Sequence, residues 1–508
     1  MVANAGLQSQ TGTQAMQILM SMPSAMADAF PRLAPERMHR WYVTSDPVDC
    51  PLGSGGGTSW LLSQAWKSTG EGQSFSDWIA DDAKLITHSG GQSRRLPAYA
   101  AMGKALMPIP AFRWAYGQRL DQTLIDLQLP DYQRLVEAGG TDYAAMITSG
   151  DVMIRFPRNL PPLPQVDVLC LGLWVAPEEA QHFGVFFCPR GDASDLQFFL
   201  QKPPAAKVRE LSADHLFMVD TGIWLLSPRA VEVLMKKCGW DSAAGTYQGS
   251  TPNEYELYAD FGLGLGAKPI ATDAEVNSLT SAVLPLPDGE FYHFGTSRDL
   301  IKSVTALQRR VLDQSKFSLT AIEARLNQHT QNSQIEIEIP SSCQPLWIEN
   351  SQISAGWELT AEHVVTGIPA NDWQVTLPAG GCLDAVPIGD KDFCWRAYGI
   401  DDAFHGDIAD VETTYLGQPV GDWFAKRGLS IESAGGQGTD LQTATIFPVL
   451  SLEEASGPFL EWLFAAEPAA GSDHAAVWLS ARRLSARQLS VEVNLRRVGS
   501  SRETNLRR

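Results

Sequence analysis

The stretch of this chain with the clearest chemical potential is residues 84–110, KLITHSGGQSRRLPAYAAMGKALMPIP. Its residues 85–87 are apolar or β-branched, which is typical of a buried strand. Gly90 and Gly91 then let the backbone turn sharply and bring its N–H groups close to a ligand. Three cations follow: Arg94, Arg95 and Lys104. Phosphate oxygens accept backbone and charge-assisted side-chain hydrogen bonds together, so the pattern favours a polyphosphate; a surface turn with incidental basic residues is the alternative.

A second glycine-rich motif precedes the first. Residues 53–58 read GSGGGT and open a run of helical character, SWLLSQAW. Glycines closed by a threonine at the start of a helix can cradle an anion or a nucleotide base. The motif lacks the lysine of the Walker P-loop and the spacing of the dinucleotide fingerprint. Glycine loops often only turn the chain, so this motif gains its weight from the neighbouring cationic one.

The composition is that of an acidic, globular protein. Hydrophobic residues make up 44% of the 508 residues, and the formal net charge is −19. That charge argues against a nucleic-acid backbone as the main partner. The seven cysteines have no CxxC spacing, so neither a disulfide framework nor a thiolate metal site is indicated. No apolar run approaches the roughly 18 residues of a membrane span, and no signal-peptide pattern is evident, so we expect a cytoplasmic protein.

The spacing of apolar runs divides the chain into regions of different class. Residues 1–40 are predicted to form a helical lead-in. From 41 to 330, strand-like runs alternate with helical patterns, which is typical of an α/β layered sheet. Residues 331–406 carry short β segments between polar turns, which predicts an all-β, β-helix-like domain. Residues 407–508 resemble a helical connector and end in a basic tail that we expect to be disordered.

The ordered motifs resemble one known family. GSGGGT, HSGGQSRRLP and GKALMPIP are followed by SGDVMIRF, FFLQKP, VDTGIWLLSPRAVEVL, YELYADFGLGLG, GEFYHFGTSRDLI, LPAGGCLDAVPIG and CWRAYGIDDAFHG. This series is similar to the fucose-1-phosphate guanylyltransferase (GDP-fucose pyrophosphorylase) family, including the N-terminal half of the bifunctional fucokinase/GDP-fucose pyrophosphorylases. The resemblance covers most of residues 40–410. It implies a Rossmann-like nucleotidyltransferase mixed sheet flanked by helices, ahead of the all-β domain and a short helical C-terminal segment.

The resemblance also implies a reaction: transfer of a guanylyl group from GTP to a hexose 1-phosphate, first of all L-fucose 1-phosphate, with release of pyrophosphate. Positioning and charge neutralisation dominate such a transfer. Arg95 and Lys104 are the expected catalytic residues, which stabilise the triphosphate and its leaving group. The expected nucleotide-binding residues come from both glycine motifs: Gly55, Gly56, Gly57, Thr58, Gly90, Gly91, Gln92, Ser93 and Arg94.

A divalent metal, Mg²⁺ or Mn²⁺, is the cofactor that this chemistry implies. Magnesium prefers one or two carboxylates beside substrate phosphates. Asp151 follows an apolar strand, where α/β sheets place their ligands, and the resemblance makes it the metal aspartate. Asp260, in YADFGLG, is the second candidate. The alternatives are a cap for Asp151 and a turn-forming role for Asp260.

The sugar phosphate has its own set of expected contacts: Lys202, Asp220, Thr221, Gly222 and His293. Lys202 follows a short aromatic strand, where similar nucleotidyltransferases use a lysine for the sugar phosphate; an exposed surface lysine is the alternative. Residues 220–222 join two strands and could approach the sugar hydroxyls. His293 lies among aromatic residues, where a packed, hydrogen-bonded histidine is the alternative.

Two other classes of function stay open. The first is a sugar-kinase-family fragment, but its nearest phosphate-loop match, GLGLGA at residues 262–267, has no serine and no lysine in the required place. The second is a non-catalytic nucleotide-sugar-binding subunit, which would bind a GDP-sugar without releasing pyrophosphate from GTP. The expected small-molecule partners are GTP and a sugar 1-phosphate. A homo-oligomer or a separate sugar-kinase subunit stays open as a protein partner.

Overall fold

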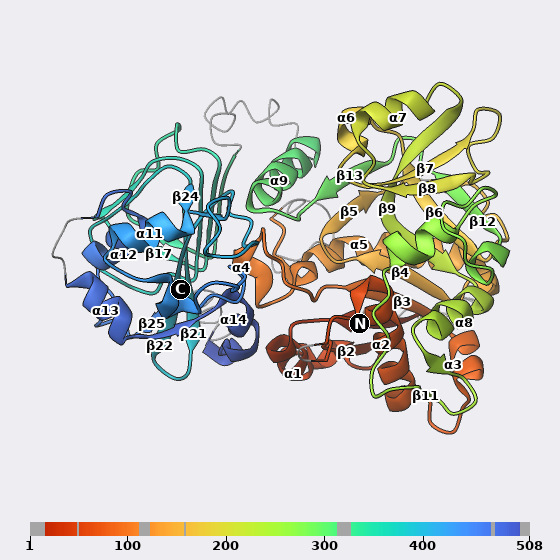
Figure 1. Ribbon diagram of the computed structural model, residues 1–508, viewed down its shortest axis with the longest axis horizontal. Coiled ribbons are helices and arrows are strands. Elements are labelled where there is room, and N and C mark those ends of the chain that lie inside the picture. The colour runs from red at the N-terminus through yellow and green to blue at the C-terminus, as the bar shows by residue number, and fades with distance from the viewer. Residues whose placement is uncertain are drawn as a thin grey trace, which may run out of the picture. The chain divides into compact units, whose positions relative to one another are not determined.

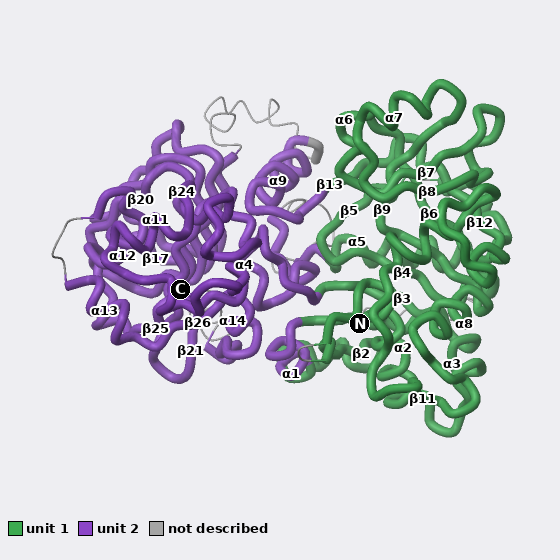
Figure 2. The backbone as a smooth tube through the Cα atoms, in the orientation of Figure 1, with its two compact units in different colours: residues 1–22, 31–89, 125–292 green, residues 23–30, 90–124, 293–508 purple. Residues whose placement is uncertain are grey.

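Two compact units divide the chain between them (Figure 2). The computed structural model describes residues 16–47, 50–110, 122–156, 159–311, 327–468 and 473–497. Unit 1 comprises residues 1–22, 31–89 and 125–292, and unit 2 comprises residues 23–30, 90–124 and 293–508. The cationic loop that begins at Gly90 therefore groups with the C-terminal half of the chain, although it directly follows a strand of unit 1.

Unit 1 is built on a mixed sheet of order β12-β6-β9-β4-β3-β1-β2, which β7 and β8 join beside β9 (Figure 1). The strands are β1 (Met16–Ser21), β2 (Trp41–Thr44), β3 (Ala83–His88), β4 (Ala145–Ser149), β6 (Val168–Leu173), β7 (Gly184–Pro189), β8 (Phe198–Gln201), β9 (His215–Leu226) and β12 (Ser281–Pro285). Strands β2, β1, β3 and β4 run parallel. The long strand β9 pairs antiparallel with β4, β6 and β7.

Helices cover this sheet and close its core. They are α2 (Gly53–Thr69), α3 (Phe75–Asp81), α5 (Leu124–Gly139), α6 (Pro177–Ala180), α7 (Ala205–Leu211) and α8 (Pro228–Lys237). Leu61 of α2 and Leu234 of α8 lie in one apolar cluster with Ile86 of β3 and Trp224 of β9. Smaller pairs are β10 (Trp240–Asp241) with β11 (Thr246–Tyr247), and β5 (Val152–Arg155) with β13 (Glu290–His293).

The strand-rich part of unit 2 is a stack of coils. Strands β14 (Gln328–Gln331), β16 (Leu346–Glu349), β19 (His363–Thr366) and β21 (Gly381–Ile388) pair in parallel. Two further parallel ladders join β15 (Gln334–Ile335) to β17 (Gln352–Ile353) and β18 (Trp357–Leu359) to β20 (Val375–Leu377). Paired residues lie 17 or 18 positions apart, as in Leu346 with His363 and Gln328 with Leu346. Each coil therefore buries its apolar side chains against the next.

Antiparallel strands and short helices complete unit 2. Strands β22 (Asp392–Gly399), β25 (Phe447–Leu450) and β26 (Arg482–Leu484) extend the sheet from β21, and β23 (Thr414–Tyr415) pairs with β24 (Gln418–Pro419). The helices are α4 (Pro97–Ala100), α9 (Ser297–Val311), α11 (Val420–Lys426), α12 (Gly457–Phe464), α13 (His474–Ser480) and α14 (Ala486–Glu492), while α1 (Ser24–Leu33) starts in unit 2 and ends in unit 1.

These elements confirm the predicted α/β mixed sheet flanked by helices, the β-helix-like region and the helical C-terminal segment. The lead-in differs from its helical prediction at Met16–Ser21, which forms β1 between two parallel partners, whereas Ser24–Leu33 forms the helix α1. A short, continuous apolar run suits a strand buried on both faces. The domain boundaries at 40, 330 and 406 stay predictions, and the end of the basic tail lies outside the described residues.

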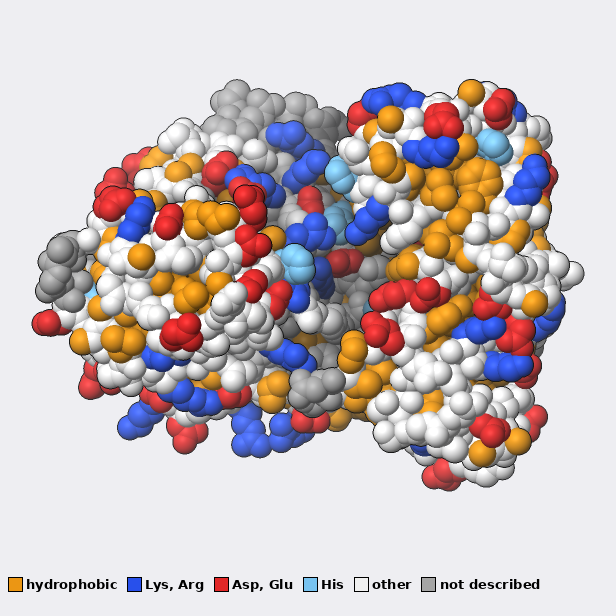
Figure 3. Space-filling view, in the orientation of Figure 1, with side chains coloured by type: hydrophobic (Ala, Val, Ile, Leu, Met, Phe, Trp, Pro, Cys, Tyr) orange, Lys and Arg blue, Asp and Glu red, His pale blue; other side chains and the backbone are white. Residues whose placement is uncertain are grey.

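The surface carries charges of both signs. Figure 3 shows acidic and basic side chains interspersed on the face that it displays. Within the described ranges, no helix has both the length and the apolar character needed to cross a membrane.

Candidate functional site

The carboxyl ends of three parallel strands in unit 1 form one edge of the sheet. Ser21 of β1 pairs with His88 of β3, which pairs with Ser149 of β4. The turn after β4 lies directly on the end of β3, because the Gly150 N–H donates to the His88 carbonyl oxygen at 2.9 Å. A Cβ atom at Gly150 would lie 2.5 Å from that oxygen, so only glycine fits there. This turn delivers Asp151 to the sheet edge, where α/β proteins place their ligands.

A hydrogen bond from Ser149 orients Asp151. The Ser149 hydroxyl donates to Asp151 Oδ1 at 2.6 Å. A single oriented carboxylate at the mouth of a sheet fits the pattern of one or two carboxylates that magnesium uses beside substrate phosphates. Across the described residues, no group of three or more His, Cys, Asp or Glu side chains could hold a metal by itself.

His88 ties the sheet edge to helix α2. Its Nε2 lies 2.8 Å from the Thr58 hydroxyl, which lies 2.9 Å from the Ser54 carbonyl oxygen. Burial lowers the pKa of His88 to about 4, so the imidazole is neutral at pH 7. When the neutral imidazole donates its Nε2 proton to the Thr58 hydroxyl oxygen, the hydroxyl can donate its own proton to the Ser54 carbonyl oxygen. Thr58, expected at the nucleotide, is thus fully buried in the contact between α2 and β3.

The first glycine motif is the first turn of α2 and packs against a distant segment. Both the Gly55 and the Gly56 N–H groups donate to the Tyr255 carbonyl oxygen, at 2.8 and 3.0 Å. A Cβ atom at Gly56 would lie 2.9 Å from the Asn253 carbonyl oxygen. These glycines therefore permit close packing, and their N–H groups are already bonded within the protein. At Gly57 a Cβ atom would lie 3.8 Å from the His88 ring, so this glycine has ordinary space around it.

Alanine at Gly56 is expected to destabilise unit 1 by about 1–3 kcal/mol, because the new methyl group overpacks a backbone contact. Urea unfolding, followed by tryptophan fluorescence, measures the effect. The matched control is Gly421→Ala in helix α11, where a Cβ atom meets nothing within 4 Å. Alanine there should raise stability by about 0.5–1 kcal/mol through helix propensity. If both substitutions changed the free energy of unfolding equally, the segment at 253–257 would not constrain α2.

Strand β9 kinks beside the same sheet edge. Gly222 has a φ of +74°, and a Cβ atom there would lie 3.4 Å from the Ser149 Cβ. The Asp220 carboxylate accepts from the Gly222 N–H at 2.9 Å and from Trp224 Nε1 at 3.0 Å. The Thr221 hydroxyl donates to the Leu171 carbonyl oxygen at 3.0 Å. Asp220 and Thr221 are both buried and hold the kink, whereas Gly222 brings β9 against β4.

Burial raises the pKa of Asp220 to about 7, although hydrogen bonds from Gly222 and Trp224 act in the opposite direction. In the unfolded chain the carboxyl group ionises near a pKa of about 3.9, so folding takes up a proton between about pH 4 and 7. This group therefore lowers stability as the pH rises through that range. The groups facing it, the buried Cys170 and the half-buried Tyr258, have raised pKa values and stay neutral there.

Asp220→Asn should abolish this pH dependence, because the amide oxygen still accepts the two hydrogen bonds but cannot ionise. The variant should gain a few kcal/mol over the native protein at pH 8 and little at pH 4, since each pKa unit is worth about 1.4 kcal/mol. Urea midpoints at intervals from pH 4 to 8 provide the measurement. Parallel curves for the two proteins would contradict the raised pKa.

The remaining predicted side chains of the sheet edge are placed differently. Lys202 is exposed, has a φ of +48°, and donates its N–H to the Phe183 carbonyl oxygen. Asp260 is also exposed, and its Oδ2 accepts the Glu256 N–H at 2.8 Å, so it closes its own turn. His293 groups with unit 2, where its Nδ1 lies 3.0 Å from Asp299 Oδ2. Lys202 and Asp260 thus make local backbone contacts of their own, whereas His293 ends β13, the strand that pairs with β5 directly after Asp151.

The cationic loop after β3 forms hydrogen bonds with the C-terminal part of unit 2. Arg94 Nη1 donates to Asp440 Oδ1 and to the Phe404 carbonyl oxygen, both at 2.6 Å. Gln442 Nε2 donates to the Gln92 carbonyl oxygen at 3.0 Å. Burial opposes ionisation of Asp440, but hydrogen bonds from the backbone and from Arg94 hold its pKa below the usual range. Asp440 and Gln442 lie in none of the motifs that stand out in the sequence.

The other predicted residues of this loop differ from Arg94 in backbone conformation and exposure. Gly91 has a φ of +87° with open space around it, and Ser93 has a φ of +44°. The Arg95 side chain is exposed, and its carbonyl oxygen accepts the Ser297 N–H at 3.0 Å. Lys104 is half-buried at the start of a 3-10 turn. Arg94 is thus a structural anchor for the loop, whereas Arg95 is presented to solvent.

Comparison with known proteins assigns the chain to a family. The family model described as "Fucose pyrophosphorylase domain" matches residues 77–283 and 272–452. The chain belongs to the fucose pyrophosphorylase domain family. It is 44% identical over 490 residues to the L-fucokinase/L-fucose-1-P guanylyltransferase of Bacteroides fragilis. The match covers 96% of this chain and 51% of that protein, so the chain spans about half the length of its relative.

Two solved structures are distantly similar to the chain. A mannose-1-phosphate geranyltransferase from Thermus thermophilus is 12% identical, with a TM-score of 0.28 over 76% of this chain and 96% of that one. An apo UDP-glucose pyrophosphorylase is 9% identical, with a TM-score of 0.25 over 59% of this chain and 100% of that one. Scores this low support no detailed comparison of sites.

Proposed function

We propose that this chain transfers the guanylyl group of GTP to L-fucose 1-phosphate and releases pyrophosphate. The observation that carries the proposal is the 44% identity, over 96% of the chain, to a relative named as an L-fucose-1-P guanylyltransferase. The fold adds a sheet edge with an oriented carboxylate in unit 1 and a cationic glycine loop in unit 2. Both features suit a nucleoside triphosphate and a sugar phosphate.

In the proposed reaction, a phosphate oxygen of the sugar phosphate bonds to the α-phosphorus of GTP. The bond between that phosphorus and the oxygen bridging to the β-phosphate breaks, and pyrophosphate leaves with the electron pair. Arg95 and Lys104 would neutralise charge on the triphosphate, and the N–H groups of Gly90 and Gly91 would bind its oxygens. Asp151 would hold a Mg²⁺ or Mn²⁺ ion, which would neutralise the phosphate charge.

A pyrophosphate-release assay tests this function. The full chain is incubated with each of the four ribonucleoside triphosphates, in turn with L-fucose, D-mannose and D-glucose 1-phosphates, in Mg²⁺ or in excess EDTA. GTP with L-fucose 1-phosphate should turn over fastest, and EDTA should stop the reaction. A folded protein that binds GDP-fucose but turns over no pair would instead be a non-catalytic subunit. The same proposal includes a cytoplasmic location and a protein partner that is either a second copy of the chain or a separate sugar-kinase subunit.

Asp440→Asn is expected to reduce kcat about three- to tenfold, because Arg94 loses its ion pair and the loop that carries Arg95 is less well positioned. The pair is partly exposed, so the loss of stability should stay below about 1 kcal/mol. Steady-state kinetics and a melting curve give the two values. The control is Asp372→Asn, an exposed carboxylate elsewhere in unit 2. Native kcat in Asp440→Asn would show that Arg94 does not position the loop.

A further inference from the structure

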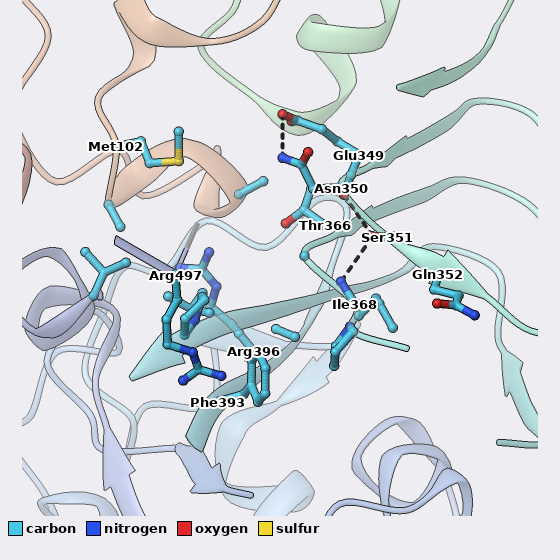
Figure 4. A pocket seen from close by; sticks show the side chains of 18 of the residues that line it. Met102, Glu349, Asn350, Ser351, Gln352, Thr366, Ile368, Phe393, Arg396 and Arg497 are labelled. Carbon is cyan, nitrogen blue, oxygen red and sulfur yellow. Dashed lines mark hydrogen bonds between the residues drawn. The ribbon is translucent and has the colours of Figure 1, made fainter. Parts of the chain in front are cut away.

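Unit 2 contains a pocket of about 520 Å³ that the proposed reaction does not use. Figure 4 shows it between the segment after α4, the turns of the coil stack and the C-terminal residues. Met102, Ile368, Val386 and Phe393 contribute apolar walls, and Arg396 and Arg497 contribute cations. Neither the loop residues 90–95 nor Lys104 line it. Its volume is that of a site for a small organic molecule.

Arg396 is the unusual group in this pocket. Its side chain is 1% exposed, and Nε and Nη2 donate to Asp384 Oδ2 at 3.0 and 2.6 Å. Nη2 also donates to the Pro97 carbonyl oxygen at 2.6 Å. Nη1 has no hydrogen-bond partner among the described residues. A buried guanidinium donor is rarely left unpaired, because the lost hydrogen bond is costly. An acceptor oxygen of a ligand would supply the missing partner.

A second guanidinium is held in place nearby in the lining. Arg497 Nη1 donates to the carbonyl oxygens of Ile388 and Asp392, at 3.1 and 2.7 Å, and its guanidinium lies 4.4 Å from the Phe393 ring centre. The carboxylate of the lining, Glu349, accepts from the Tyr99 hydroxyl and from Asn350 Nδ2. Figure 4 shows Glu349 well apart from Arg396. The arginine side of the pocket therefore favours an anionic head group.

We propose that this pocket binds a small organic acid, whose carboxylate or phosphate is bound by Arg396 and Arg497. Guanidinium groups match the oxygens of both anions in geometry and charge. The body of the molecule is apolar, since it packs against Met102, Ile368 and Phe393. The site is separate from the residues assigned to GTP and does not depend on the proposed transfer reaction.

Calorimetric titration of the full chain with four probes tests the site: phenyl phosphate, benzoate, benzyl alcohol and inorganic phosphate. Phenyl phosphate or benzoate should bind at least about tenfold more tightly than benzyl alcohol, the difference expected for one charge-assisted hydrogen bond. Tighter binding of phenyl phosphate would identify an organic phosphate as the occupant, and tighter binding of benzoate a carboxylic acid. Inorganic phosphate should bind more weakly than phenyl phosphate, because it leaves the apolar walls unused.

Two variants and one control variant locate the binding. Ala370→Trp fills the pocket from an exposed lining position and should weaken the anion about tenfold or more. Arg497→Gln should weaken the anion but leave benzyl alcohol unchanged, and Ala409→Trp, an exposed alanine outside the pocket, should change neither. Hydrogen exchange should slow at residues 98–102 and 366–370 on binding. Absence of binding by both anions, equal affinity for benzyl alcohol, or affinity unaffected by Ala370→Trp would each overturn the proposal.

Discussion

Lys104→Ala is expected to lower kcat for pyrophosphate release by about 10²-fold or more. Loss of one charged group that stabilises a transition state costs several kcal/mol. Lys104 follows Gly103, whose φ of +86° turns the chain, and it starts the 3-10 turn that ends the cationic segment. Its half-buried ammonium would act on the leaving pyrophosphate, where negative charge accumulates. The effect should therefore appear in kcat more than in KM for GTP.

The control for Lys104 is Lys207→Ala, which removes an exposed lysine paired with Glu210 in helix α7. That variant should keep native kcat, and both variants should show native melting curves. Arg95→Ala should resemble Lys104→Ala, since the Arg95 side chain is exposed and its fold contact is made by the backbone. If Lys104→Ala stays within a few-fold of native kcat, the cation that stabilises the leaving group lies elsewhere.

Asp151→Asn is expected to lower activity at limiting Mg²⁺ by about 10²-fold or more, because an amide oxygen is a much weaker ligand for a hard cation than a carboxylate. The variant keeps its fold, since asparagine can still accept the Ser149 hydroxyl at Oδ1. Raising the Mg²⁺ concentration should recover part of the activity. Initial rates across a Mg²⁺ titration, at fixed GTP and L-fucose 1-phosphate, measure both effects.

Asp260→Asn is the informative comparison for Asp151. The Asp260 carboxylate accepts the Glu256 N–H in its own turn, and an amide oxygen can do the same. We therefore expect activity within a few-fold of native and an unchanged Mg²⁺ dependence. If Asp260→Asn instead changed the Mg²⁺ dependence more than Asp151→Asn did, the metal would bind away from the end of β4.

Local sequence patterns predicted much of the sheet edge. The apolar run before Gly90 is strand β3, and the run before Asp151 is β4. Because neighbouring parallel strands end at the same edge, Asp151 could be placed there from sequence alone. The helical prediction for residues 16–21 was wrong because a short apolar run is equally compatible with a buried helix and a buried strand.

Contacts between distant residues could not be predicted. Nothing near Gly56 in the sequence indicates that Asn253 lies against it, so its packing contact could not be predicted. Arg94 pairs with Asp440 at a separation of 346 residues, so no local pattern could predict this ion pair. Likewise, the 17- or 18-residue length of each coil in the β region follows from strand pairs such as Leu346 with His363. The sequence itself shows no obvious repeat of residue types with that spacing.

We propose that this chain moves the α-phosphate of GTP, with its nucleoside, onto a sugar phosphate. The most direct measurement is the fate of radioactive phosphorus in GTP incubated with L-fucose 1-phosphate, the full chain and Mg²⁺. We expect label at the α-position to appear in GDP-fucose, and label at the γ-position to appear in pyrophosphate. Transfer of the γ-label to the sugar, or α-label that stays in GTP while the protein is folded, would contradict the account.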